Sequence, residues 1–224
     1  VEFSHPEGDE KDWVRKIAKG AFKGCGKLTR FEIPYTVKEI EEEAFLGCKA
    51  LQSVVLPTGV KLGRNAFDPS CTLQKEYEIK NGVLLAYNGY DSHAKVPEGV
   101  TLIAENAFAA SRERLLSVDI PEGVRAIGAG AFEGCTKLEF INLPKSLRSI
   151  GERAFAGCTS LKCFNPDATG LEEIGSHAFR NCTKLETVEL YSNRLQSIAE
   201  DAFEGCTRLR SIVSSAKARN AVRQ

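Results

Sequence analysis

Cysteine gives this 224-residue chain its widest choice of chemistry, because a thiol can bind a metal ion, form a disulfide or act as a nucleophile. Of the eight cysteines, seven recur three or four residues after the phenylalanine of an Ala-Phe pair: Cys25, Cys48, Cys71, Cys135, Cys158, Cys182 and Cys206. Side chains stacked at equivalent places are parallel, with Cβ atoms about 4.8 Å apart, whereas a disulfide needs about 3.8 Å and converging side chains. We therefore expect buried, reduced thiols in preference to a disulfide framework, and the cysteines do not fix a redox compartment.

Cys163 is the one cysteine outside this series. It lies beside Phe164 at a predicted outward strand position, so we expect an exposed thiol. A thiol enzyme needs a distinctive cysteine with a histidine partner. The sequence favours a chance exposed cysteine over a nucleophile, and we predict that the chain is not an enzyme.

The histidines and glycine-rich stretches do not predict a metal or nucleotide site. His5, His93 and His177 are scattered, without a metal-like pairing to a nearby Asp, Glu or Cys. Residues 20–27, GAFKGCGK, have the wrong spacing for a phosphate loop, and no Ser or Thr follows the lysine. We predict no catalytic residue, no cofactor-binding residue and no metal ligand.

The charge balance excludes several classes of partner. Lys+Arg and Asp+Glu number 30 each, so no net field would attract nucleic acid or an anionic membrane. No apolar run approaches the roughly 20 residues of a membrane span. The first residues lack a signal-peptide pattern, but a chain without methionine is expected to be a mature or trimmed piece, so this leaves the compartment open.

These residues belong to an internal repeat. Ala-Phe pairs end at Phe22, 45, 67, 108, 132, 155, 179 and 203, with spacings of 22–24 residues and one interval of 41. Residues 127–144 show the unit best: I-G-x-x-A-F-x-G-C-x-x-L-x-x-I-x-L-P. A fixed period of this length predicts a solenoid, in which each coil stacks on its neighbours and buries its Phe, Leu and Ile in continuous ladders.

Each unit contains two extended segments and a tight turn. Ile141 and Leu143 alternate with polar residues, which is the pattern of a half-buried strand, and Pro144 ends it. A second short apolar step, Leu147 to Ile150, returns the chain along the other side. The Ala-Phe-x-Gly-Cys segment is too short for an α-helix and fits a tight or 3₁₀-like turn.

The long interval predicts a β-hairpin. Asn81-Gly82 and Asn88-Gly89 flank the short apolar run 83–87, and Asn-Gly is a strong hairpin signal because both residues accept positive φ. We expect a structural insert at residues 72–96 rather than a ligand loop. The predicted organisation is one solenoid domain at residues 14–213, with a cap or lead-in at 1–13 and a cap or tail at 214–224.

The repeated unit resembles the BspA-like leucine-rich repeat family over residues 14–213, since Ala-Phe-x-Gly-Cys and Leu-Pro recur together in register. Asn81-Gly82-Val83-Leu84 followed by Val96-Pro97-Glu98-Gly99-Val100 resembles that family's irregular hairpin insert. Residues 60–63 and 108–111 depart from the pattern and leave the local register open. The resemblance implies a right-handed leucine-rich-repeat solenoid with short parallel strands, from extracellular or cell-surface proteins associated with adhesion, and no shared catalytic residues.

The most informative functional prediction is geometric. If Ile141 and Leu143 point inward, then Phe140 and Asn142 point outward, and parallel strands place equivalent residues in rows about 4.8 Å apart. The predicted outward face comprises Arg30, Glu32, Ser53, Val55, Lys95, Ser117, Asp119, Phe140, Asn142, Cys163, Asn165, Thr187, Glu189, Ser211 and Val213. Its charge is mixed, and Phe140 is the first choice as an anchor.

The sequence thus favours a non-catalytic binding or adhesion module that uses this face. Its partner would be a protein or peptide, such as a host surface or matrix protein, with no nucleic acid and no membrane insertion of this segment. The alternative is a structural spacer within a larger surface protein. The identity of the partner and the oligomeric state stay open.

Overall fold

The computed structural model describes residues 14–166 and 170–214. They form two compact units, of which unit 1 holds residues 14–76 and 88–91 and unit 2 holds residues 77–87, 92–166 and 170–214. Within each unit, short strands pair between successive coils of the chain, and the described residues contain one 3₁₀ helix, Ala109–Ser111, and no α-helix. This confirms the predicted leucine-rich-repeat solenoid. The predicted domain boundaries stay predictions.

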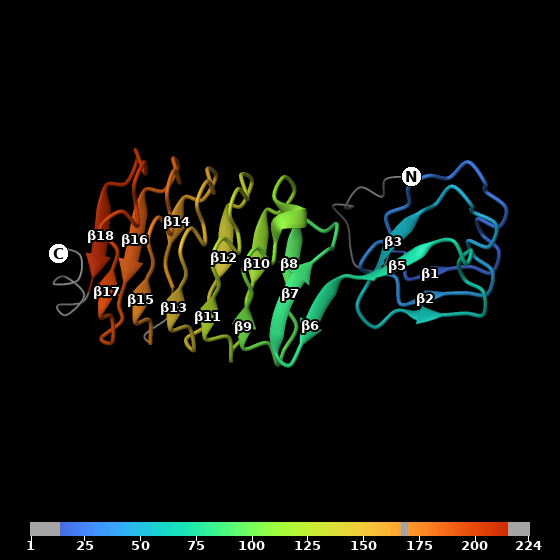
Figure 1. The fold of residues 1–224 in the computed structure, drawn as a ribbon, viewed down its shortest axis with the longest axis horizontal. Helices are drawn as coiled ribbons and strands as arrows, with labels where there is room; N and C mark the ends of the chain where they lie inside the picture. The colour runs from blue at the N-terminus through green and yellow to red at the C-terminus, as the bar shows by residue number, and fades with distance from the viewer. Residues whose placement is uncertain (1–13, 167–169, 215–224) are drawn as a thin grey trace. The chain divides into compact units, whose positions relative to one another are not determined.

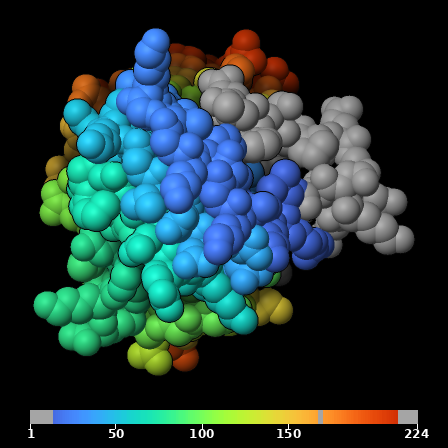
Figure 2. Space-filling view, turned by 90° about the vertical axis from the view of Figure 1, so that its right-hand side faces the viewer, coloured from blue at the N-terminus to red at the C-terminus, as the bar shows by residue number. Residues whose placement is uncertain are grey.

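Unit 1 is a stack of coils with two parallel sheets in its described residues. One sheet has the order β1-β2-β4, at Lys16–Ile17, Glu39–Ile40 and Lys61–Leu62. The other pairs β3 with β5, at Ser53–Leu56 and Thr72–Lys75. Figure 2 shows the successive coils of unit 1, blue to cyan, packed on one another. No strand forms at Phe31 and Ile33, although both side chains are buried as predicted.

Unit 2 carries two rows of strands along the stack, as Figure 1 shows. One row is a sheet of order β17-β15-β13-β11-β9-β7-β6, at Ser197–Ile198, Glu173–Ile174, Ser149–Ile150, Ala126–Ile127, Leu102–Ile103, Val83–Tyr87 and Tyr77–Lys80. The other row consists of β8, β10 and β12, at His93–Lys95, Ser117–Asp119 and Phe140–Asn142, and of β14, β16 and β18, at Cys163–Phe164, Thr187–Leu190 and Ser211–Ser214. The strands pair in parallel, except that β6 and β7 are antiparallel.

The β6–β7 pair is the predicted hairpin. Asn81 and Gly82 join the two strands with φ of 52° and 75°, as a type I′ turn requires. The hairpin also supplies an aromatic residue to the core that the repeat pattern does not reveal. Tyr87 is fully buried, its ring lies 5.3 Å from that of Phe108, and its N–H donates to the carbonyl of Ala107 at 2.7 Å. Ala86-Tyr87 therefore takes the place of an Ala-Phe pair within the long interval.

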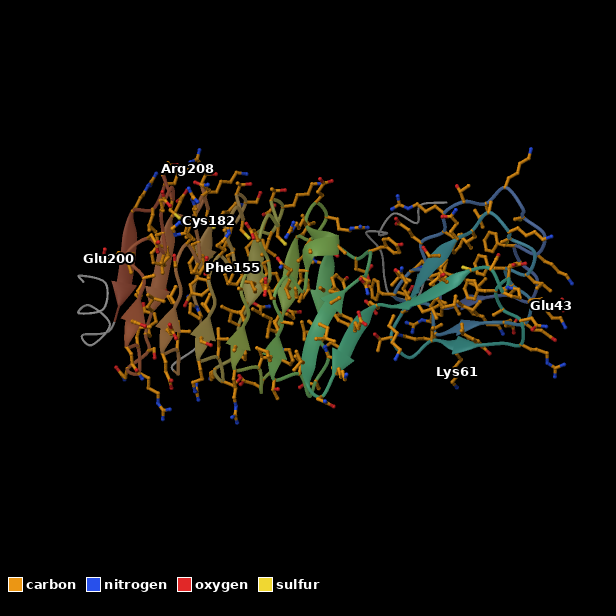
Figure 3. All side chains as sticks on the ribbon, viewed as in Figure 1. Glu43, Lys61, Phe155, Cys182, Glu200 and Arg208 are labelled. Carbon is orange, nitrogen blue, oxygen red and sulfur yellow. The ribbon has the colours of Figure 1, made fainter. Side chains whose placement is uncertain are left out.

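A ladder of stacked phenylalanines fills the interior of each unit. In unit 2, Phe155 lies between Phe132 and Phe179, with ring centroids 5.1 Å and 5.2 Å away and rings within 10° of parallel. Phe155 is fully buried inside the stack (Figure 3). In unit 1, Phe45 stacks between Phe22 and Phe67, 4.9 Å from each. The backbone follows the same spacing, because the N–H of Phe155 donates to the carbonyl of Ala178 at 2.8 Å.

The residue two places before the ladder phenylalanine adopts a left-handed conformation in most coils. The residues with φ between 51° and 64° at this slot are Gly20, Glu43, Asn65, Asn106, Gly130, Arg153 and His177. Left-handed backbone favours Gly and Asn and costs other residues free energy. This explains the Gly and Asn residues at four of these seven positions but not Glu43, Arg153 and His177.

The repeated cysteines form a second ladder beside the phenylalanines. The Cys158 thiol donates to the carbonyl of Phe132 at 3.2 Å, and the Cys182 thiol donates to that of Phe155 at 3.2 Å. All eight cysteines are free. Cys48, Cys135, Cys158 and Cys182 are buried as predicted, whereas Cys25 is exposed and Cys71 and Cys206 are half-buried, so the prediction of burial is wrong for these three. Among the described residues of its unit, each of the three lies in the first or last coil, which has a neighbouring coil on one side only.

Removing an interior ring of the ladder tests its contribution to stability. We expect Phe155→Ala to lower the free energy of unfolding by about 3–5 kcal/mol, because a buried ring is lost and a cavity remains. Phe203→Ala, at the half-buried end of the same ladder, should cost clearly less. Urea unfolding of both variants measures the difference, and equal losses would contradict a continuous interior ladder.

The Ile-Gly step of the interior coils offers a steric test. A Cβ on Gly151 would lie 2.8 Å from the backbone nitrogen of Ala129 and 2.9 Å from the carbonyl carbon of Gly128. Gly151→Ala should therefore push two coils apart and lower the free energy of unfolding by about 1–3 kcal/mol. The exposed neighbour supplies a control, since Glu152→Ala should change stability by less than about 0.5 kcal/mol.

Thiol labelling tests the cysteine ladder. Burial raises the pKa of the Cys135 thiol to about 12, and it raises the pKa of Cys158 well above the ordinary value. At pH 8 in the folded state, we expect N-ethylmaleimide to modify the exposed Cys25 and Cys163 and to spare Cys135 and Cys158. Peptide mapping by mass spectrometry reads out the sites, and unfolding in guanidinium should make all eight reactive.

Candidate protein-binding face

The central part of the candidate face is the sheet β8-β10-β12 of unit 2. Its register places Ser117 between His93 and Phe140, and Asp119 between Lys95 and Asn142. The middle residue of each strand, namely Ala94, Val118 and Ile141, packs against the core. The flanking residues must therefore point outward, because successive side chains of a strand alternate between its two sides.

A hollow of about 450 Å³ opens on this sheet. It is lined by His93, Leu116, Ser117, Val118, Asp119, Glu139, Phe140 and Asn142. Phe140 is 56% exposed, which is the largest exposed fraction among the large hydrophobic residues in the described part of the chain. Leaving this ring in water forgoes the free energy of burial, so its position is a reason to look for a partner.

Polar side chains around the Phe140 ring form hydrogen bonds and an ion pair between neighbouring coils. His93 Nδ1 and Ser117 Oγ form a hydrogen bond of 2.6 Å. The Asn142 amide donates to the Asp119 carboxylate. Glu139 forms an ion pair with Lys162, in which Lys162 Nζ lies 3.2 Å from Glu139 Oε2. These contacts link outward side chains of neighbouring coils around the ring.

The remaining predicted face residues of unit 2 continue this surface along the stack. The registers pair Cys163 with Thr187, Thr187 with Ser211, and Glu189 with Val213. Among them, Cys163, Asn165 and Ser211 are exposed and Thr187 and Glu189 are half-buried, whereas the side chain of Val213 lies outside those that the structure describes. Every predicted face residue of unit 2 whose side chain the structure describes therefore reaches solvent, including Lys95, Asp119 and Asn142.

The predicted face residues Arg30, Glu32, Ser53 and Val55 belong to unit 1. Arg30 and Ser53 are exposed, and Glu32 is half-buried and forms an ion pair with Arg30. Val55 is only 5% exposed, so the prediction that it faces solvent is wrong.

A distant stretch of sequence lies near Val55. Gly89, Tyr90 and Asp91 line a small pocket together with Val55, and the Arg30 guanidinium lies 5.8 Å from the centre of the Tyr90 ring. Burial, together with the charges of Glu76 and Glu32, raises the pKa of Asp91 to about 7.

Three residues of interest were not among those predicted. His93 and Glu139 line the hollow, and Tyr191 is 50% exposed just after β16. His93 could have been found, because it lies two residues before the outward Lys95 in the same strand. Glu139 lies just before β12, where no alternation of strand residues predicts its orientation.

The other cysteine and histidine residues that could take part in chemistry do not line the hollow. Cys163 is exposed as expected. His177 bridges two coils on the turn side, with its Nδ1 2.7 Å from Asp201 and its Nε2 3.5 Å from Glu204.

Within residues 14–166 and 170–214, no group of three or more His, Cys, Asp and Glu side chains has the arrangement of a metal site. The described residues contain no helical segment with the length and hydropathy of a membrane span.

Solved structures with the same architecture are bacterial leucine-rich repeat proteins. A leucine-rich cell-surface protein from Faecalibacterium prausnitzii A2-165 is 33% identical over 97% of this chain, with a TM-score of 0.59. The leucine-rich repeat protein TpLRR of T. pallidum is 33% identical over 61% of this chain, with a TM-score of 0.55. The pneumococcal vaccine antigen PcpA is 25% identical over 91%, with a TM-score of 0.57.

The chain corresponds to only part of these proteins, since it covers 61%, 66% and 56% of their respective lengths. A comparison with curated protein sequences finds no match. The model of the BspA-type leucine-rich repeat region matches residues 15–111 and 101–221, nearly the entire chain. On the strength of the repeat, the fold and this match, the chain belongs to the BspA-type leucine-rich repeat family.

Proposed function

We propose that this chain is a non-catalytic protein-binding module, with an adhesive role at a cell surface, and that it binds through the outward strand face of unit 2. The observation that carries the proposal is the exposed Phe140 ring over a hollow on a sheet of fixed register. A few aromatic and arginine side chains dominate most protein interfaces, and an extended solenoid sheet offers a wide contact area around such an anchor.

Three further observations support this proposal. The sheet lies on a well-packed core, so the face needs little reordering when a partner binds. The similar Faecalibacterium prausnitzii protein is described as a cell-surface protein, which supports an extracellular location for this chain. The chain carries no net charge, which favours recognition by local contacts over long-range attraction.

Binding to purified host-surface and extracellular-matrix proteins tests the proposal. For any protein bound by surface plasmon resonance, we expect Phe140→Ala to raise Kd by at least about tenfold, because a central aromatic anchor is lost. Tyr191→Ala is the matched control, since this aromatic is similarly exposed and does not line the hollow. Equal losses from the two substitutions would mean that the hollow has no special part in binding, and no loss from either would remove this face from consideration.

A structural spacer within a larger surface protein is the second candidate. It is favoured by the coverage of the solved proteins, because the chain corresponds to about three fifths of the Faecalibacterium protein. A spacer would hold other domains apart without a ligand of its own. Normal adhesion by cells whose full-length protein carries Phe140→Ala, and its loss when the repeats are shortened, would support the spacer.

A further inference from the structure

The hollow around Phe140 has a charge of its own. Its lining contains two carboxylates, from Asp119 and Glu139, and no lysine or arginine. The whole chain, in contrast, has equal numbers of acidic and basic residues. The charged groups that line the hollow are therefore all acidic, while Lys162, which pairs with Glu139, and Lys95, beside Asp119, lie outside its lining.

The lining is also rich in hydrogen-bond acceptors. The Asn142 Nδ2 donates to Asp119 Oδ1, which leaves the Asn142 carbonyl oxygen and Asp119 Oδ2 as acceptors. No residue in the described part of the chain makes a hydrogen bond or ion pair with Asp119 Oδ2, although Lys95 lies next to Asp119 in the register. Lys162 occupies one oxygen of Glu139. A ligand with several donors fits such a surface.

The Phe140 ring and the acceptors on Asp119 and Asn142 are close enough to contact the same ligand group. Phe140 is opposite Ser117, and Asp119 lies two residues further along the same neighbouring strand. Strand spacing and rise place the Cα atoms of Phe140 and Asp119 about 8 Å apart. A planar cation stacked on the ring can therefore direct its N–H groups toward Asp119 and Asn142.

We propose that this hollow binds an arginine side chain of the protein partner, with the guanidinium plane on Phe140 and its N–H groups on Asp119 and Asn142. Arginine fits better than lysine because its head group is planar, weakly hydrated and carries several donors in a fixed arrangement. An aromatic face attracts a cation placed over it. The proposal rests on the proposed function, and it adds the chemistry of the residue that the partner must present.

Short peptides test the ligand chemistry without knowledge of the partner. The probes are capped pentapeptides of glycine and serine with arginine, citrulline or lysine at the centre, titrated into the ¹⁵N-labelled chain and followed by NMR. We expect the arginine peptide to shift the amide signals of residues 117–119 and 139–142, and to bind about fivefold more tightly than the uncharged citrulline peptide. Lysine should lie between them. Equal binding of arginine and citrulline would overturn the proposal.

Substitutions assign the contacts. Asp119→Asn keeps the shape and an acceptor for Asn142 but removes the charge, so we expect about fivefold weaker arginine binding. Phe140→Leu keeps an apolar side chain without the aromatic face and should weaken binding about threefold. Glu173→Gln, at an exposed carboxylate of β15 in the other row of strands, is the matched control and should have no effect. An unchanged affinity in Asp119→Asn would contradict the assigned contact.

The two proposals can fail separately. If Phe140→Ala abolishes capture of a host protein while the arginine peptide does not bind, the face is a binding site but its ligand is not arginine. If the arginine peptide binds as expected and Phe140→Ala leaves host-protein binding unchanged, the arginine site stands and the proposed function fails. Concentration-dependent self-association that Asp119→Asn abolishes would identify the partner as a second copy that presents an arginine.

Discussion

The stacking of each coil on the next is the interaction on which the rest of this structure depends. A single coil cannot bury its own phenylalanine, whereas Phe155 between Phe132 and Phe179 is completely covered. The same spacing lets backbone N–H groups of one coil donate to carbonyls of the next, so the aromatic ladder and the hydrogen-bond ladder reinforce each other. Cysteine joins this arrangement as a small apolar side chain whose thiol finds a carbonyl on the neighbouring coil.

This constraint separates the residues that maintain the fold from those that are free to make a binding surface. Inward positions such as Val118 and Ile141 must remain apolar because they pack in the core. Outward positions on the same strands have no such requirement, and one of them carries an exposed phenylalanine. Because the register fixes Ser117 beside Phe140 and Asp119 beside Asn142, outward residues of different coils become neighbours on one surface. A solenoid can thus change its ligand by changing these positions without changing its core.

Much of the fold could be predicted because each repeat has a recognisable sequence pattern. The alternation around Ile141 and the Asn81-Gly82 turn each indicate a structure within a few residues of chain, and the spacing of the Ala-Phe pairs repeats every 22–24 residues. Tyr87 was missed because the rung it provides lies in an insert with a different spacing and uses tyrosine. The exposure of the Cys25 thiol was missed because the first coil has the same sequence pattern as the interior coils, although it is less covered.

The sequence by itself determined the solenoid, the direction in which most strand residues of the face point, with Val55 as the exception, and the selection of Phe140 as an outward aromatic. Those properties follow from the short period of the repeat, in which alternation along a strand decides what faces the core. Only the tertiary structure decided that Val55 is buried beside a pocket it shares with Gly89, Tyr90 and Asp91, and that His93 and Glu139 join Phe140 around one hollow. These contacts unite residues that are far apart in the chain or outside the alternating strands, and no local pattern encodes which outward side chain will be covered and which will remain in solvent.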